Sequence, residues 1–550
     1  MKRLIFFFFI KDCMSEKEGA PSIFLREATG LVRDLDALDV LIIVFSAINL
    51  GGILTSGIFE APYLFPGSNM VAIWFIGLLP AVGYLLVYLT LGLLMPRSGG
   101  DYVFVSRVLG PAFGFVWVWI ALLYQTTGIG GFAFSLSWSG LSTTLAVLGV
   151  IFKSNTFLEL SKTVSTIPVG PILSTGFIIL AFLITVFGTR VYRKTMKFLF
   201  IVSTLGLLIC LGSLLVSNNS IFSSNLKAYL PEGIDYSTII KLAKQNGYSP
   251  VGDVFVQNLM AGLAIAWVSY TGFWNMVYVG GEVRNFRKTL PTIMLFSLFG
   301  TALFSAFTSF LAQNTFGYDF IGAFQYLYFN APSYYPLSIP PTGLFLLVSI
   351  VQNPIFILFV SISLMIWNFM FLPIYFLIYS RAFFAVAFDR LFPSKLAEVD
   401  ERFNSPINAL IVTALVIEVY NLAYWVWGPM AAMVNFSIAF PIAFALTGLS
   451  AVLLPFLKKS YFDQLPSSLK TKILGIPLVS IAGVWMMVFS LILASAAAFS
   501  LPGAFYGIGI AVILTISAYT SGFLIYYFIK WYRAREGIDI TLAFKEIPPE

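Results

Sequence analysis

The stretch Asn49-Leu50-Gly51-Gly52-Ile53-Leu54-Thr55-Ser56-Gly57-Ile58-Phe59 lies inside an apolar segment that runs from about Val40 to Phe65. That segment is long enough to cross a bilayer, which takes about 20 residues. Its glycines make a poor helix interior, because each costs about 1 kcal/mol and hydrocarbon offers no water to the freed peptide groups. The stretch predicts either a transmembrane helix broken at mid-depth around a polar ligand, or a groove where small residues let helices pack closely.

The composition of the whole chain indicates a protein with many membrane spans. Of 550 residues, 59% are hydrophobic and only 10% are charged, whereas soluble domains have about 25% charged residues. The chain has no histidine, which excludes acid–base chemistry by histidine and mixed His/Cys metal sites. Its two cysteines, Cys13 in a polar tail and Cys210 in an apolar segment, predict neither a disulfide framework nor a metal centre.

Apolar runs predict twelve spans, with boundaries good to several residues. The runs are residues 39–65, 70–94, 112–135, 172–189, 198–217, 252–280, 289–312, 354–379, 406–427, 431–456, 474–499 and 504–530. The third run stays apolar to about Ile151, which leaves open a longer tilted helix or an additional outer helix. A short helix is also expected at Ile321 to Phe329, in a long outer loop.

We expect the chain to span the cell membrane. The distribution of its positive charges predicts that both termini lie in the cytoplasm. Most of the 32 Lys and Arg residues then lie inside, as the positive-inside rule requires, and those in outer loops are Lys153, Lys162, Lys227, Lys241 and Lys244. The net charge of +7 is explained by topology and by attraction to anionic membrane lipids, so no nucleic-acid partner is expected.

Six segments follow from this topology. They are a cytoplasmic N-terminal tail (1–36), a first five-helix repeat (37–217), an extracellular loop (218–251), a second five-helix repeat (252–456), helices eleven and twelve (457–530) and a cytoplasmic C-terminal tail (531–550). Residues 1–13 resemble the start of a signal peptide but lack a cleavage site, and we interpret them as an over-extended start before Met14.

A second interrupted span occurs five spans after the first. The residues Trp267-Val268-Ser269-Tyr270-Thr271-Gly272-Phe273-Trp274 place hydroxyl groups and a glycine in the middle of span six. An odd number of spans per repeat inverts the second copy, so interruptions in spans one and six are typical of five-plus-five inverted-repeat transporters. The pair favours a ligand site over a packing groove at the first stretch. The predicted fold class is an all-α membrane protein of twelve transmembrane helices.

Four separated motifs resemble the amino acid-polyamine-organocation superfamily of permeases, between Asp39 and Trp427. The motifs are Thr55-Ser56-Gly57-Ile58-Phe59 with Pro62; Pro96-Arg97-Ser98-Gly99-Gly100-Asp101-Tyr102 with Gly110-Pro111 and Gly114-Phe115; Tyr270-Thr271-Gly272-Phe273 with Gly281-Glu282-Val283-Arg284-Asn285, Arg287 and Pro291; and Arg381 to Pro393 with Pro406 to Leu410. The resemblance implies a leucine-transporter-like five-plus-five fold with broken helices one and six. It also implies transport of amino acids or related amines.

The chain departs from the family at two positions of the expected site. Thr55 stands where a glycine is usual, and Trp274 stands where many members carry an acid. The substrate preference of the family is therefore not carried over to this chain.

The two breaks predict a site that recognises the carboxylate and ammonium groups of an amino acid by their charge. A helix N-terminus carries about half a positive charge, so the amides near Thr55 to Gly57 suit a carboxylate. The carbonyls that end the inner half of helix one, near Ile48 to Gly51, and those of helix six near Trp267 to Tyr270 suit an ammonium group. Gly57 is expected to adopt a left-handed or strained conformation. The predicted substrate-binding residues are Ile48, Gly51, Gly52, Thr55, Ser56, Gly57, Trp267, Ser269, Tyr270, Thr271, Gly272 and Trp274, with Tyr270, Phe273 and Trp274 as rings that close over the substrate.

Ion coupling leaves several alternatives open. Glu60, an acid in the outer half of helix one, and the hydroxyls of Ser361 and Ser363 in span eight are candidate proton or sodium sites, whereas Glu418 in span nine is a less favoured buried acid. Proton-coupled relatives often carry a lysine in helix five, where this chain reads Ile201 to Gly206. Coupling to H+, coupling to Na+ and exchange without an ion all remain alternatives, and no metal or other cofactor is expected.

Charged residues at the inner helix ends predict either ordinary ion pairs or an inner gate, and they are Arg97, Glu282, Arg284, Arg381 and Asp389. An intramembrane enzyme would need buried clusters of acid, histidine or lysine, and a channel would need a repeated pore loop. The spans supply neither. The sequence therefore favours a transporter, whose oligomeric state it does not predict.

Overall fold

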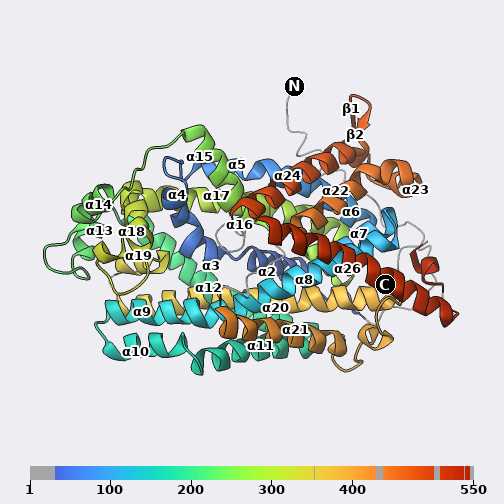
Figure 1. Cartoon of the computed structure of the whole chain (residues 1–550), viewed down its shortest axis with the longest axis horizontal. Helices are drawn as coiled ribbons and strands as arrows, with labels where there is room; N and C mark the ends of the chain where they lie inside the picture. Colours follow the sequence, from blue (N-terminus) through green and yellow to red (C-terminus); the bar gives the residue numbers. More distant parts are fainter. Residues whose placement is uncertain (1–30, 352, 429–437, 501–507, 538, 545–550) are drawn as a thin grey trace.

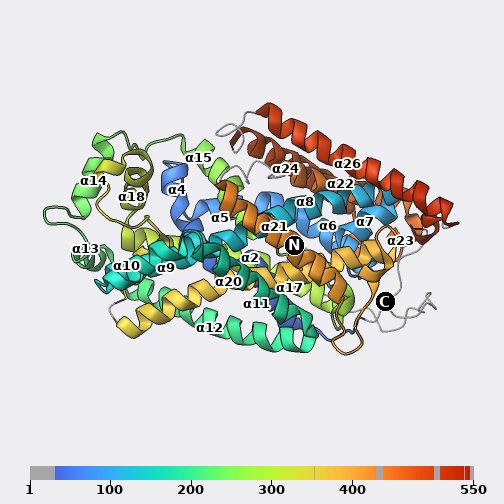
Figure 2. The same ribbon diagram turned by 60° about the horizontal axis from the view of Figure 1, so that its bottom comes forward.

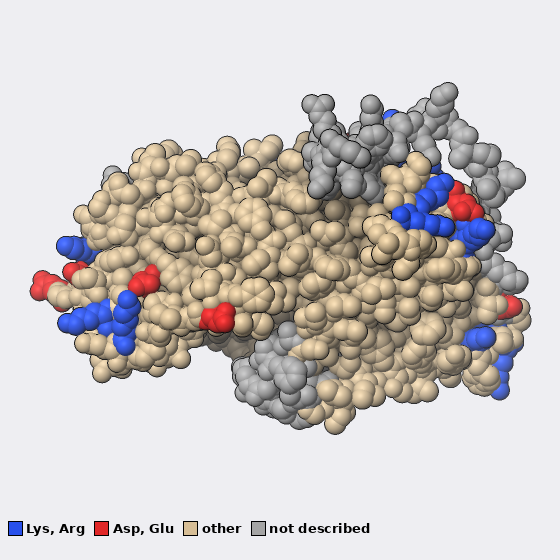
Figure 3. All heavy atoms as spheres, turned by 90° about the horizontal axis from the view of Figure 1, so that it is seen from above, with Lys and Arg blue, Asp and Glu red and all other residues tan. Residues whose placement is uncertain are grey.

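The computed structural model describes residues 31–351, 353–428, 438–500, 508–537 and 539–544. The predicted tail up to residue 30, with Cys13, lies outside these ranges. Twelve helical segments are long and apolar enough to cross a membrane, as predicted. They run along one elongated bundle (Figure 1). Lys, Arg, Asp and Glu gather near the two ends of the bundle, and the broad band between them shows almost none (Figure 3).

The first five spans are built from interrupted as well as continuous helices. In chain order their elements are α2 (Ala37–Ile48), α3 (Leu50–Gly52), the π-helix η1 (Ile53–Gly57), α4 (Ile58–Leu64), α5 (Ala72–Ile76), α6 (Leu78–Leu94), the short α7 (Asp101–Val108), α8 (Pro111–Ser135), the π-helix η2 (Leu136–Leu141), α9 (Ser142–Ile151), α10 (Asn155–Val164), α11 (Val169–Val186) and α12 (Gly188–Val216).

The remaining elements follow after a helical loop. They are α13 (Asn219–Leu226), α14 (Tyr236–Gln245), α15 (Val254–Ala261), the π-helix η3 (Gly262–Trp267), α16 (Val268–Tyr270), the 3-10 turns η4 (Asn275–Tyr278) and η5 (Gly280–Glu282), α17 (Phe286–Phe316), α18 (Tyr318–Asn330), η6 (Pro332–Tyr334), α19 (Gly343–Ser349), α20 (Pro354–Phe388), η7 (Ser394–Ala397), α21 (Ile407–Trp427), α22 (Ala439–Leu457), α23 (Lys459–Phe462), η9 (Ser467–Lys470), β1 (Lys472–Ile473), β2 (Ile476–Pro477), α24 (Leu478–Ser500), α26 (Ile508–Arg535) and η10 (Ile540–Phe544).

The third span settles an alternative that the sequence left open. Its helix continues from Pro111 through the π-turn η2 to Ile151, a run of 41 residues. At 1.5 Å per residue this helix is about 60 Å long, twice the hydrocarbon thickness. The apolar run therefore belongs to one long helix, and α10 follows it as a separate piece.

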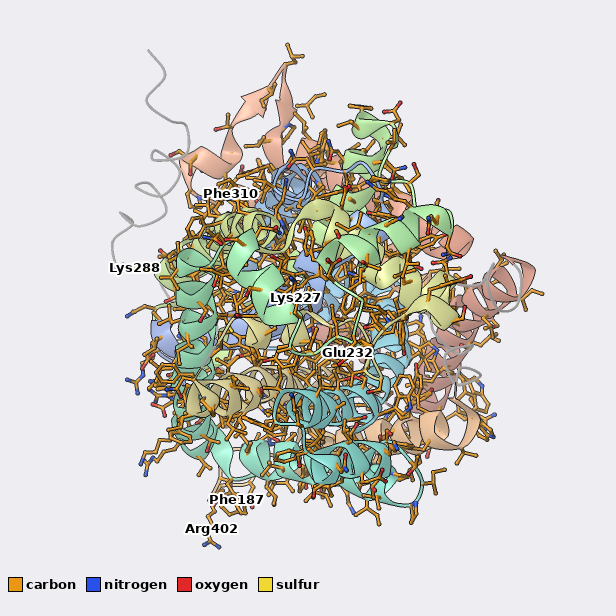
Figure 4. The ribbon with its side chains drawn as sticks, turned by 90° about the vertical axis from the view of Figure 1, so that its left-hand side faces the viewer. Phe187, Lys227, Glu232, Lys288, Phe310 and Arg402 are labelled. Atoms are coloured by element: carbon orange, nitrogen blue, oxygen red, sulfur yellow. The ribbon has the colours of Figure 1, made fainter. Side chains whose placement is uncertain are left out.

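Short helices cover one end of the bundle, which we call the α14 end; the opposite end, which carries α7 and α23, is called the α7 end (Figures 1 and 2). Helix α18 confirms the helix expected at Ile321 to Phe329. Figure 4 looks onto the α14 end, where Lys227 and Glu232, between α13 and α14, lie over the middle of the view. Phe187 and Arg402 lie at the lower edge of the same view.

Helices α24 and α26 lie along one margin of the bundle (Figure 2). Helix α24 packs closely on α22 through glycines, because a Cβ at Gly483 would lie 2.5 Å from the carbonyl oxygen of Gly448. Small residues are the usual means of close approach between membrane helices. The hairpin of β1 and β2 between these two helices was not predicted, and it turns at Leu474 and Gly475, both with positive φ, as tight hairpins require.

Candidate functional site

Helix six is interrupted where the sequence predicts. After α16 the chain turns through Thr271 to Trp274 and continues as the 3-10 turn η4. Gly272 has φ +113, a conformation that L side chains rarely adopt. A Cβ there would also lie 3.0 Å from the carbonyl carbon of Ala47 in α2. Gly272 is thus required both by the turn and by the close approach of helix one.

Helix one is interrupted within the range, Ile48 to Gly51, where its inner half was expected to end. The break falls at Asn49, which has φ 58 and separates α2 from α3. The side chain of Asn49 accepts a hydrogen bond from the Gly52 amide at 3.0 Å and donates one to Oδ1 of Asn368 in α20 at 2.9 Å. Asparagine is favoured both in left-handed backbone and as a helix N-cap. This residue starts the second part of helix one, although it was not among the predicted site residues.

The expectation of strained backbone at Gly57 is wrong. Residues 53–57 form the π-helix η1, and Gly57 has φ −55 and ψ −41, which are ordinary helical values. A Cβ at Gly57 would lie 3.7 Å from the Ser269 hydroxyl, which is an ordinary contact. Because η1 continues the helix, its amides belong to a helical turn. They do not form the free N-terminus that was proposed as a carboxylate cradle.

Gly51 and Gly52 serve packing. A Cβ at Gly51 would lie 2.6 Å from the Cβ of Trp367 in α20, and one at Gly52 would lie 2.7 Å from Nδ2 of Asn49. Neither glycine could be replaced without moving α20 or the Asn49 cap. At Gly51 the structure favours the packing groove that the sequence left as an alternative, whereas Gly52 makes room for the Asn49 cap of its own helix.

A cavity of about 400 Å³, here called the aromatic cavity, lies at the break of helix six. Helices α6, α8, α20 and α22 enclose it, and its lining residues are Tyr84, Tyr124, Gly128, Ile129, Phe132, Trp267, Val268, Thr271, Gly272, Trp274, Asn275, Tyr278, Phe371, Tyr375, Phe440, Pro441, Phe444 and Leu493. More than half of these side chains are aromatic, and none is charged. Four predicted site residues line it: Trp267, Thr271, Gly272 and Trp274.

Two of the predicted rings point elsewhere. The Tyr270 hydroxyl donates to the backbone oxygen of Trp74, and both Tyr270 and Phe273 are fully buried outside the cavity lining. Ser269 donates to the Ile265 carbonyl of its own helix at 2.8 Å. Only Trp274, of the three rings proposed to close over a substrate, faces the cavity, and it stacks on Tyr88 with centroids 5.2 Å apart.

A second cavity, of about 450 Å³, lies beside the outer half of helix one and is called the vestibule cavity. Its lining residues are Thr55, Phe59, Glu60, Tyr63, Leu64, Gln325, Phe329, Pro340, Pro341, Thr342 and Gly343. Thr55 donates to the Gly51 carbonyl at 2.9 Å. The residues predicted as one site are therefore divided between two cavities, and among the described residues helix one lines only the vestibule cavity. Ile48 is buried and lines neither.

The residues proposed for ion coupling lie in different parts of the structure. Glu60 lines the vestibule cavity, whereas Ser361 donates to the Ile357 carbonyl of its own helix at 2.8 Å. Ser363 is buried against helix five, where a Cβ at Gly206 would lie 2.2 Å from the Cβ of Ser363. Glu418 accepts hydrogen bonds from Thr175 and Asn421, between α11 and α21. Within the described ranges, no group of three or more acidic or cysteine side chains is placed to hold a metal ion.

The charged residues predicted at helix ends form buried ion pairs at the α7 end. Arg381 in α20 holds Glu282 through two bonds, of 2.7 and 2.8 Å, and both side chains are almost fully buried. Asp389, at the end of α20, accepts two bonds from Arg107, of 2.6 and 2.9 Å, and a third from the Tyr102 hydroxyl. These contacts tie helix six and α7 to α20.

A chain segment before helix one adds further contacts at the α7 end. Leu35 donates to the Glu282 carbonyl at 3.0 Å and accepts from the Arg284 amide at 2.9 Å. Arg284 pairs with Asp34, and the backbone of Arg97 lies beside Gly280. Partial burial raises the pKa of Asp36, but hydrogen bonds from the Asp39 amide and from Lys197 outweigh it and bring the pKa to about 2.

The sequence model for amino acid permeases matches residues 35–528, which include both breaks, both cavities and the two buried ion pairs. This chain belongs to the amino acid permease family. The family is one of transporters, not of enzymes.

Individual relatives match shorter parts of the permease. Large neutral amino acids transporter small subunit 2 of Oryctolagus cuniculus is 33% identical over 119 residues, 20% of each chain. The same transporter subunit of Mus musculus is 32% identical over 111 residues, 19% of each chain. Branched-chain amino acid permease BcaP of Lactococcus lactis is 24% identical over 282 residues, 48% of this chain and 53% of that one. The permease thus spans about a fifth of the mammalian relatives and about half of the bacterial one.

Proposed function

We propose that this permease is a secondary transporter that moves amino acids across a membrane by alternating access. The observation that carries the proposal is the aromatic cavity, which lies at the break of helix six in the middle of a twelve-span protein. Transporters place their substrate sites at such discontinuous helices, because unwound backbone offers peptide groups that a regular helix does not.

The aromatic, uncharged lining of the cavity favours large uncharged amino acids as substrates. Aromatic side chains dominate its lining and no charged side chain takes part, so a charged substrate side chain would lose its hydration without gaining a partner. The turn from Thr271 to Trp274 and the side-chain amide of Asn275 offer hydrogen-bonding groups for the ammonium and carboxylate groups of an amino acid. The names of the relatives, large neutral and branched-chain amino acid transporters, agree with this class.

The arrangement and orientation of the helices form part of the same proposal. Breaks at Asn49 and Gly272, in spans one and six, support an inverted repeat of five-plus-five helices. The distribution of Lys and Arg supports a cell membrane location with the α7 end, and both termini, in the cytoplasm. The buried pairs Glu282–Arg381 and Asp389–Arg107 support an inner gate at that end, which these pairs would hold closed.

Transport by the purified protein tests the proposal. The protein is reconstituted in liposomes with and without internal unlabelled substrate, and uptake of labelled leucine, phenylalanine, lysine and glutamate is compared. Leucine and phenylalanine should accumulate or exchange, and lysine and glutamate should not. Correctly folded protein that moves none of the proteinogenic amino acids and no common polyamine would contradict the function. A preference for lysine or glutamate would contradict the substrate class alone.

A further inference from the structure

Asp101, the first residue of α7, is fully buried and accepts hydrogen bonds from three hydroxyl groups. Tyr88 of α6 donates to Oδ1 at 2.7 Å, Thr447 of α22 donates to the same oxygen at 2.6 Å, and Tyr278 of η4 donates to Oδ2 at 2.7 Å. These donors come from three segments that are far apart in the chain. The sequence motif contains Asp101, but the site described above makes no use of it.

No positive charge compensates this carboxylate among the described residues. Arg107, on the same helix, is engaged with Asp389 and Ser106, and Arg381 of α20 is engaged with Glu282. The groups that face Asp101 from the elements around it are hydroxyls: Tyr88, with Tyr84 nearby, from α6, Tyr278 from η4 and Thr447 from α22. A buried carboxylate without a cation is costly in its charged form, and a bound proton removes that cost.

The network connects Asp101 to the aromatic cavity. Tyr278 lines the cavity and donates to Asp101. Tyr88 donates to Asp101 and stacks on Trp274, which lines the same cavity, with an interplanar angle of 4°. Burial raises the pKa of Asp101 to about 6, against hydrogen bonds from Thr447, Tyr278 and Tyr88 that lower it. The carboxylate therefore lies one side chain away from the proposed substrate.

We infer that Asp101 binds and releases the proton that couples substrate transport to a proton gradient. This inference rests on the proposed function and names the coupling ion that the sequence left open. The proton adds to a carboxylate oxygen of Asp101 from water in the cavity when the α14 side is open. It leaves to water on the α7 side when the gate there opens.

Alternating access itself changes the proton affinity of this group. Tyr278 belongs to the part of helix six that follows the break, and that part is held by the Glu282–Arg381 pair in the closed gate. When the gate opens, this segment moves and withdraws the Tyr278 hydroxyl from Asp101. Opening also exposes Asp101 to water, which makes its charged form less costly and favours release of the proton. In this mechanism the gain in hydration exceeds the opposite effect of losing the Tyr278 donor. Proton binding is thus tied to the state of the gate.

The test uses the full-length protein in liposomes with labelled leucine and a clamped membrane potential. Wild type should take up leucine at least about threefold faster when the outside is acidified relative to the inside. In Asp101→Asn this response should disappear, while exchange of external for internal leucine stays within about threefold of wild type. Thr447→Val removes one donor and should move the midpoint of the pH response upward by about half a pH unit or more. The matched control is Thr413→Val, a buried threonine that bonds its own helix, and it should leave the midpoint unchanged.

Several outcomes overturn the inference. One is wild-type protein that exchanges leucine well but ignores the pH gradient, which leaves the proposed function intact. Another is Asp101→Asn protein that still responds to the gradient. A third is folded Asp101→Asn protein that loses exchange as well, because the network is then only a latch for the gate. Should Asp101→Asn not fold, the midpoint of Thr447→Val decides, and an unshifted midpoint contradicts the inference.

Discussion

Gly272 and Ala47 bring the two interrupted helices into contact, backbone against backbone. Gly272 has φ +113, and a Cβ there would lie 3.0 Å from the carbonyl carbon of Ala47, two residues before the break at Asn49. The breaks of helices one and six therefore support each other, and a substitution at one break should displace the backbone at the other.

Gly272→Ala should reduce leucine transport at least about tenfold, because the new methyl group meets helix one and the backbone must leave its left-handed conformation. The matched control is Gly57→Ala, where φ is −55 and the nearest atom would be 3.7 Å away. That variant should transport normally and be equally or more stable, since alanine favours a helix. Equal activity of the two variants in liposomes would show that the Gly272 turn is not needed.

Asn49→Ala should lower the free energy of unfolding by about 2 kcal/mol, from a lost N-cap of about 1 kcal/mol and the strain of alanine in left-handed backbone of about 1 kcal/mol. Asn49→Gly tolerates that backbone and should cost less, although both variants lose the bond to Asn368. Thermal unfolding in detergent compares the loss of stability in the two variants. If glycine were as damaging as alanine, the Asn368 bond and not the backbone would hold the break.

Arg381→Met should destabilise the protein by about 3 to 5 kcal/mol, because it leaves the buried charge of Glu282 without a partner. The double variant with Glu282→Gln should recover a large part of that loss. Arg284→Ala, which breaks a partly exposed pair with Asp34, is the control and should cost about 1 kcal/mol or less. Thermal unfolding at one pH compares wild type, Arg381→Met, Glu282→Gln, the double variant and the Arg284→Ala control. A loss in the double variant equal to the sum of the two single losses would argue against coupling of the pair.

The stability of the permease should fall as the pH rises from about 4 to 6. The pKa of Asp101 is about 6 in the folded protein and 3.8 in the unfolded chain. The folded state therefore binds the proton more tightly over that range, and raising the pH costs about 3 kcal/mol once Asp101 is ionised. Asp101→Asn should lack this component. The difference in thermal unfolding temperature between variant and wild type, measured at pH 5 and pH 7.5, checks it, and an equal difference at both values would contradict it.

The spans and one of the two breaks could be predicted from the sequence, because both depend on local properties. Apolar length marks a span, and Gly272 at the centre of one marks a place where a helix ends. The break of helix one was predicted only to within a few residues, since Gly51 and Gly57 look like flexible points. Gly51 is instead needed by a tertiary contact with Trp367, and the real break uses the capping chemistry of Asn49.

The candidate site was only partly predictable for a related reason. Trp267, Thr271, Gly272 and Trp274 are neighbours in the chain and were found together. Tyr375 comes from another helix and carries no local signal that distinguishes it from the many other aromatic residues. Asp101 lay within a recognised motif, but its role depends on Tyr88, Tyr278 and Thr447, whose proximity only the folded chain reveals.

Filling the aromatic cavity tests most directly whether it is the substrate site. Gly128 lines the cavity, and a Cβ there would meet no atom within 4 Å, so Gly128→Leu adds bulk to the cavity without disturbing the protein around it. Gly212→Leu, in α12 and away from both cavities, has the same open surroundings and serves as the control. Binding of labelled leucine to the purified proteins should weaken at least about tenfold, or about 1.4 kcal/mol, in Gly128→Leu and stay unchanged in Gly212→Leu. Leucine binding by Gly128→Leu with the affinity of wild type would contradict the assignment of the site.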